Sequence, residues 1–113
     1  MKIDSFSAGE IIIEGKRYSS DVIVYPSRVK DDWWRENGHQ VYPEDIEEVV
    51  QEKPEVLVIG IGEYGMMEVS PETKRYLEEQ GIALVIEATG KACQTYNELC
   101  SSRKVIGAFH LTC

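Results

Sequence analysis

The chain has few cysteines, a minority of basic residues and no long hydrophobic segment, and each shortage excludes a class of protein. Its three cysteines lack the close pairing of structural zinc sites and are too few for a disulfide scaffold. No apolar run approaches the ~20 residues that cross a bilayer. Lys and Arg total 12 against 20 Asp and Glu, and the resulting net charge of -8 repels a phosphate backbone. We therefore expect no metal, no membrane span and no nucleic-acid partner.

The rest of the composition is that of a globular protein. Hydrophobic residues make up 42% of the 113 residues and charged residues 28%, which suits one domain over residues 1–113. The N-terminus, Met1-Lys-Ile-Asp-Ser, has no apolar region of the kind found in signal peptides. Cys93 and Cys100 lie on one predicted helix, separated by ~10 Å, which prevents a disulfide between them. Reduced cysteines and the missing signal region predict a cytoplasmic protein.

Residues 56–87 give the strongest indication of the fold. Two apolar segments, 56–60 and 82–87, enclose a glycine-containing turn and a helix predicted over 71–80. Neither segment alternates polar with apolar residues, which is typical of strands covered on both faces. The order strand, helix, strand predicts a parallel pair with a right-handed crossover. The fold class is therefore α/β, a three-layer domain with a mixed sheet.

The other elements complete this architecture with about three helices and an N-terminal antiparallel β hairpin. Ser70 and Gly81 flank the middle helix as its predicted N-cap and C-cap residues. Gly15 marks the turn of the hairpin, to which the first residues of the chain offer a third strand. The predicted ranges are 3–6, 11–13 and 17–25 for the N-terminal strands, 43–53 and 89–100 for the outer helices, and 105–111 for the last strand.

The turn after the first buried strand matches the letters of a dinucleotide-binding motif. Gly60, Gly62 and Gly65 have the G-x-G-x-x-G spacing, and Glu87 ends the next strand. In dinucleotide-binding proteins the helix begins at the glycines, so that its amides meet the pyrophosphate. Here the predicted helix begins only after Ser70. The glycines are therefore interpreted as shaping a turn, and no cofactor is predicted.

A crevice for a small anionic ligand is a separate hypothesis at the same edge of the sheet. The carboxyl ends of parallel strands emerge together, and ligands favour such edges. Thr89 opens a helix whose free amides attract anions, and Lys91 adds a positive charge. The alternative is that Thr89 only caps its helix, and that Asn97 makes a structural hydrogen bond. The candidate crevice residues are Gly60, Gly62, Thr89, Gly90, Lys91 and Asn97.

His110 and Cys113 suggest either a metal site or a nucleophile beside a general base. Zinc sites supply cysteines in close pairs, and Cys93 and Cys100 do not have that spacing. A catalytic pair needs a third residue to orient the base and a rigid nucleophile. A structural histidine on the last strand is the preferred interpretation, and no catalytic residue is predicted.

Trp33 and Trp34 lie in an irregular segment between the hairpin and the first helix. Two adjacent tryptophans are too large to remain fully exposed without a reason. They are interpreted either as a lid over one end of the core or as a surface that binds a partner or ligand.

Several segments together resemble the Mth-type small-domain family. They are Val56–Gly62, Gly81–Val85, Ala92 with Tyr96–Leu99, Val105–Cys113, Tyr25-Pro26 and Trp33–Arg35. The resemblance covers nearly the whole chain. It implies a compact three-layer α/β domain with a β-rich N-terminal part and no known catalytic residue set. One member of that family is a mitochondrial complex I assembly factor, which acts by binding proteins.

The sequence thus favours a non-catalytic domain that works through protein contacts, as an assembly or accessory factor. The expected partner is another protein, with self-association into a homo-oligomer as a further interpretation. The alternative is an enzyme or binder of anionic metabolites that uses the crevice at the strand ends.

Overall fold

The computed structural model describes residues 1–113. The strands are β1 (Ile3–Ser7), β2 (Glu10–Ile13), β3 (Lys16–Tyr18), β4 (Val22–Val24), β5 (Val29–Lys30), β6 (Gln40–Val41), β7 (Val56–Ile61), β8 (Glu68–Val69), β9 (Ala83–Glu87) and β10 (Val105–His110). The helices are the 3₁₀ helix η1 (Pro43–Ile46) and the α-helices α1 (Glu47–Gln51), α2 (Pro71–Glu79) and α3 (Thr89–Leu99). None of these helices combines the length and the apolar character that a membrane crossing requires.

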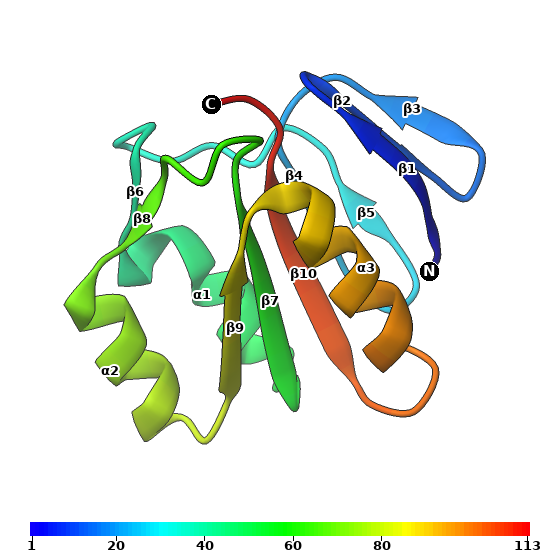
Figure 1. The fold of residues 1–113 in the computed structure, drawn as a ribbon. Helices are drawn as coiled ribbons and strands as arrows, with labels where there is room; N and C mark the ends of the chain where they lie inside the picture. Colours follow the sequence, from blue (N-terminus) through cyan, green and yellow to red (C-terminus); the bar gives the residue numbers. More distant parts are fainter.

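A five-stranded mixed sheet forms the centre of the molecule, in the order β5-β4-β10-β7-β9 (Figure 1). The predicted parallel pairing of β7 with β9 is confirmed, with Val58 opposite Val85. β10 is also parallel to β7, and β4 joins it in the antiparallel direction. β7 lies between β10 and the edge strand β9, and its first five residues are all buried. That burial explains its unbroken apolar sequence.

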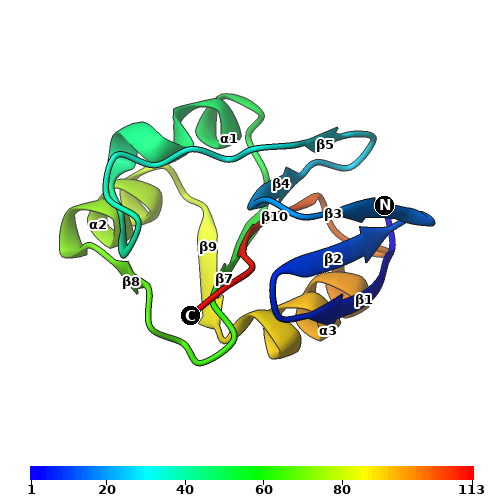
Figure 2. The ribbon, with the colours of Figure 1, turned by 90° about the horizontal axis from the view of Figure 1, so that it is seen from above.

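Helices cover both faces of the sheet and create two core layers, as the three-layer prediction required (Figure 2). Leu57 points into the layer beneath α1 and α2, where it joins Ile46 and Leu77. Val58 points to the opposite layer, where Tyr96 of α3 contributes. Consecutive residues of β7 therefore serve different cores, which follows from the alternation of side chains along a strand.

The N-terminal prediction is correct for the hairpin and wrong for its continuation. β2 and β3 pair across the turn at Glu14 and Gly15, and β1 supplies the third strand of a small separate sheet. Residues 22–24 do not continue the hairpin. They form β4, whose three residues are all buried, and pair with β10 in the central sheet. An apolar segment buries more of its surface in the central sheet than it would in a hairpin that faces solvent, and this burial favours the observed pairing.

The helix boundaries follow the predicted capping residues closely. The Ser70 hydroxyl oxygen accepts a hydrogen bond from the Thr73 N–H at 3.1 Å, and Gly81 adopts a φ of +73° after α2. The first predicted helix is divided into η1 and α1 at Ile46. β9 is less covered than predicted, because it is an edge strand whose residues are exposed or half-buried.

Candidate functional site: an acidic pocket beside two tryptophans

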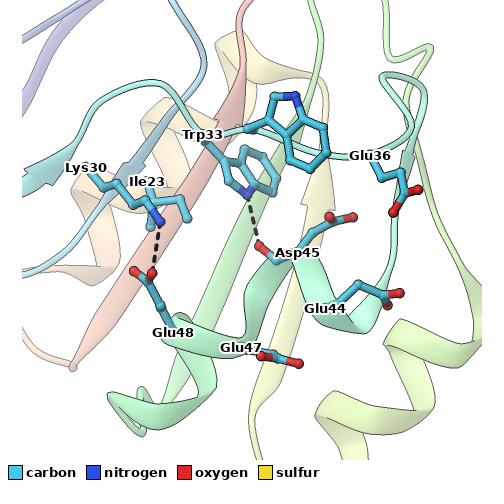
Figure 3. A pocket seen from close by; sticks show the side chains of 9 residues that line it. Ile23, Lys30, Trp33, Glu36, Glu44, Asp45, Glu47 and Glu48 are labelled. Atoms are coloured by element: carbon cyan, nitrogen blue, oxygen red, sulfur yellow. Dashed lines mark hydrogen bonds and ion pairs between the residues drawn. The ribbon is translucent and has the colours of Figure 1, made fainter.

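A pocket of about 280 Å³ lies between the segment after β5 and the helices η1 and α1 (Figure 3). We call it the acidic pocket. Most of its lining comes from one irregular segment and two short helices that lie side by side. The lining residues are Ile23, Lys30, Trp33, Trp34, Glu36, Glu44, Asp45, Glu47 and Glu48.

The two tryptophans have different environments. Trp33 is only 4% exposed and belongs to the core layer beneath α1 and α2, where its Nε1–H donates to the Asp45 carbonyl oxygen at 3.0 Å. Trp34 is 73% exposed. The surface interpretation is therefore wrong for Trp33, whose large apolar side chain is buried. Trp34 is therefore the exposed tryptophan of the acidic pocket.

Carboxylates dominate the charge of the acidic pocket. Its single basic residue is Lys30, which pairs with Glu48 at 3.1 Å. The Asp45 carboxylate accepts a hydrogen bond from the Tyr42 N–H at 2.8 Å and is held in place by it. The others, Glu36, Glu44 and Glu47, are exposed. They do not converge into a group of three that would hold a metal ion. A negative pocket with an exposed indole attracts cations, by charge and by cation–π contact.

A buried network anchors the segment that presents Trp34. Arg35 lies 4.5 Å from the Trp33 ring and donates to Asp21 Oδ2 at 2.8 Å. His110 Nδ1 lies 2.7 Å from the same oxygen, and the Leu111 N–H donates to Asp21 Oδ1 at 2.8 Å. The network joins the start of β4, the tryptophan segment and the end of β10, so the position of the pocket depends on the central sheet.

The carboxyl of Asp21 titrates below its ordinary range. Burial raises its pKa, but hydrogen bonds from His110, the Leu111 N–H and Arg35 favour the ionised form and leave the pKa lowered overall. The sequence predicted a structural role for His110 without identifying Asp21, which lies far away in the chain. A polar residue within the apolar segment 105–111 was the one available signal.

The strand-end corner predicted as a crevice is filled by the chain itself. The Thr89 hydroxyl accepts from the Gly62 N–H at 2.8 Å and donates to the His110 carbonyl at 2.6 Å. A Cβ atom on Gly62 would lie 2.5 Å from the Thr112 carbonyl oxygen, and one on Gly60 would lie 2.9 Å from the Phe109 ring. No cavity of the molecule is lined by Gly60, Gly62 or Thr89. The N-cap of α3 is Ala88, so Thr89 is not a capping residue.

The remaining crevice residues lie apart from this corner. Lys91 is exposed on α3. Gly90 and Asn97 border a groove of about 310 Å³ between α3 and β1. The Asn97 side chain accepts from the Ile3 N–H at 2.9 Å and donates to the Ile3 carbonyl at 2.8 Å. Asn97 therefore attaches β1 to α3.

The three cysteines are free thiols that occupy different environments. Cys93 is buried, and burial raises its pKa to about 12, which keeps the thiol protonated and unreactive. Cys100 is half-buried and Cys113 is exposed. Because the His110 ring is engaged with Asp21, it has a partner other than Cys113.

The sequence pattern of the family described as "Protein of unknown function (DUF498/DUF598)" matches residues 3–110. The chain belongs to this family. The match spans all ten strands of the DUF498 chain, from β1 to β10.

Relatives and solved structures agree with this assignment. The chain is 28% identical over 111 residues to "NADH dehydrogenase [ubiquinone] 1 alpha subcomplex assembly factor 3" of Bos taurus, covering 96% of this chain and 59% of that protein. The DUF498 chain thus spans 59% of the length of that relative. A conserved hypothetical protein from Pyrococcus horikoshii OT3 superimposes with a TM-score of 0.86 at 29% identity, over 100% of both chains.

The resemblance to the Mth-type family is confirmed by the family match and the assembly-factor relative, together with the fold. A Bordetella pertussis protein described as a Mth938-like domain superimposes with a TM-score of 0.68, over 97% of this chain and 85% of that chain. Its identity is 21%, so this similarity concerns the fold alone.

Proposed function

We propose that residues 1–113 form a non-catalytic protein-binding domain that acts as an assembly or accessory factor. In this proposal the acidic pocket receives a segment of a partner protein that is rich in Lys or Arg. Trp34 provides the apolar contact area, and the surrounding carboxylates select for positive charge.

The exposure of Trp34 is the observation that carries the proposal. A tryptophan that remains 73% exposed leaves a large apolar surface in water, which is unfavourable unless a partner covers it. Tryptophan is also among the residues that contribute most to binding energy in protein interfaces. Neighbouring Glu36, Glu44 and Glu47 supply the polar rim that surrounds such contacts.

The relatives support the same class of function. Their name describes an assembly factor, and the similarity covers 96% of this chain. An assembly factor binds other proteins. The match covers 59% of the length of that relative, so the proposal does not extend to the identity of its partner.

The test compares two exposed aromatic residues. Trp34→Ala removes the indole of the acidic pocket, whereas Tyr64→Ala removes a side chain of similar exposure, 76%, outside the pocket. Immobilised wild-type chain and each variant are used to capture partners from the lysate of the native cell, and a captured protein is then titrated against each form. We expect Trp34→Ala to weaken the affinity by about tenfold or more, and Tyr64→Ala to leave it unchanged.

A second variant tests the role of charge. Glu44→Gln with Glu47→Gln preserves the shape of the pocket and removes two negative charges. We expect weaker binding and a shallower dependence of affinity on salt concentration.

Equal binding by wild type and Trp34→Ala would refute the assignment of the acidic pocket.

A further inference from the structure

β9 is an exposed edge of the central sheet (Figure 1). Its sequence, Ala-Leu-Val-Ile-Glu, contains neither proline nor lysine, and it has no irregularity in its pairing with β7. Natural proteins usually protect an edge strand with such features or keep it very short. The opposite edge follows that rule, because β5 has only two residues and one of them is Lys30.

Two residues of β9 direct their backbone groups away from the sheet. The Ala83 N–H donates to the Glu55 carbonyl at 3.1 Å, so the backbone N–H and C=O groups of Ala83 point toward β7. Backbone groups alternate in direction along a strand, so Val85 and Glu87 also face β7. Leu84 and Ile86 consequently present their N–H and C=O groups at the open edge.

An apolar groove of about 530 Å³ accompanies this edge, between β9 and α2. Leu84 and Ile86 form part of its lining, and they are only partly covered. The two charged lining residues are Lys74 and Glu78, both exposed on α2. α2 runs antiparallel to β9 (Figure 1). Lys74, in the first half of α2, is therefore nearer the Ile86 end of β9, and Glu78, in the last turn of α2, is nearer the Ala83 end.

We infer that β9 pairs in the antiparallel direction with β9 of a second copy of this chain. A twofold axis at Val85 places Leu84 opposite Ile86 of the second copy, and Ile86 opposite Leu84. In that register every outward donor and acceptor of the two strands finds a partner, which gives four backbone hydrogen bonds from the alternation described above. The two central sheets become one continuous sheet. This interface lies apart from the acidic pocket and goes beyond the proposed function.

The charges beside the groove favour a second copy as the occupant. The twofold axis reverses the order of charges on α2, so Lys74 of each copy faces Glu78 of the other. The contact is therefore isologous, as expected for a symmetric dimer. Glu87, the one charged residue of β9, faces the small Ala83 of the second copy and is held by the Thr95 hydroxyl at 2.6 Å.

Cysteine cross-linking tests the register directly. In a Cys113→Ser background, Val85→Cys places two thiols opposite each other across the twofold axis. Such non-hydrogen-bonded pairs have Cα atoms ~4.5 Å apart, which permits a disulfide. Ala83→Cys is the matched control, because it lies on the same face of β9 but not on the axis. With copper–phenanthroline as oxidant, we expect a covalent dimer from Val85→Cys and little from Ala83→Cys. Absence of the Val85→Cys dimer, or equal cross-linking of both, overturns the inference.

A charge exchange tests the flanking contacts with exposed residues that leave the fold intact. Lys74→Glu and Glu78→Lys each bring like charges together, whereas the double variant restores the complementary pairs. Sedimentation equilibrium at about 0.15 M salt screens the net charge of the two copies. We expect each single variant to raise the dimer dissociation constant roughly tenfold and the double variant to recover it. A wild-type chain that remains monomeric at all concentrations, or a double variant without recovery, refutes the interface.

Discussion

The hydroxyl of Thr89 joins the ends of β7, β10 and α3. It accepts from the Gly62 N–H and donates to the His110 carbonyl, and all three groups are buried. Backbone groups buried without a partner are unfavourable, so one side chain here satisfies two groups that the sheet cannot pair. The corner considered as an anion site is instead a point of internal attachment, as the structural alternative required.

Thr89→Val should therefore destabilise the fold strongly, although it changes the shape of the side chain very little. Valine has nearly the same shape as threonine but leaves the Gly62 N–H and the His110 carbonyl without partners. We expect the free energy of unfolding to fall by about 2–3 kcal/mol, measured by urea denaturation. Thr89→Ser keeps the hydroxyl and is the control, with a loss of about 1 kcal/mol or less for the missing methyl group. If Thr89→Ser lost more stability than Thr89→Val, packing and not hydrogen bonding would dominate at this position.

The sequence identified several important residues without revealing their environments. Trp33 and Trp34 are adjacent and chemically identical, but one is buried and the other exposed. That difference depends on the Arg35–Asp21 contact, whose partners are not close in sequence. Asn97 was correctly predicted to make a hydrogen bond. Its partner, Ile3, lies at the other end of the chain and could not be identified from local sequence.

At the scale of elements, capping residues in the sequence predicted the ends of a helix, because those ends are determined by local interactions. α2 begins directly after its N-cap Ser70 and ends before Gly81, because capping and left-handed φ are properties of a few consecutive residues. The prediction that residues 22–24 continue the hairpin was wrong because β4 pairs with β10, which lies at the opposite end of the sequence. β6 and β8 each have two residues, too few for a periodic pattern.

The contact between α3 and the small N-terminal sheet depends on Asn97. Asn97→Ala removes both hydrogen bonds to Ile3, and we expect a loss of about 2 kcal/mol in the free energy of unfolding. Amide hydrogens of β1 should exchange faster, while those of β7 remain protected. Gln94→Ala is the control, because Gln94 is exposed on the same helix and borders the same groove. Equal exchange in β1 for the two variants would contradict this assignment.

At the scale of the whole molecule, the acidic pocket could be predicted only in part. The tryptophan pair was recognised from the sequence, but no local pattern indicated that the carboxylates of η1 and α1 would lie beside it. The pocket exists because the tryptophan segment lies beside η1 and α1, and that placement follows from the buried attachment of Asp21 to His110 and Leu111.

The same attachment predicts how the molecule responds to acid. The pKa of Asp21 lies below its usual value of 3.8 in the folded state, since hydrogen bonds from His110, Leu111 and Arg35 outweigh the effect of burial. The folded chain therefore binds fewer protons at this site than the unfolded chain. The resulting stabilisation is present above the unfolded pKa and is lost as the pH falls through the lower, folded pKa.

Asp21→Asn should therefore reduce stability at neutral pH and have little effect in acid. We expect the variant to lose about 3 kcal/mol at neutral pH, because Arg35 is left buried without its carboxylate. Urea denaturation across the acid range should show the wild-type and variant free energies converging as the pH falls. Asp32→Asn removes the same charge from an exposed residue without a side-chain partner and should lie close to the wild type throughout. A constant difference between wild type and Asp21→Asn at every pH would mean that ionisation of Asp21 does not stabilise the network.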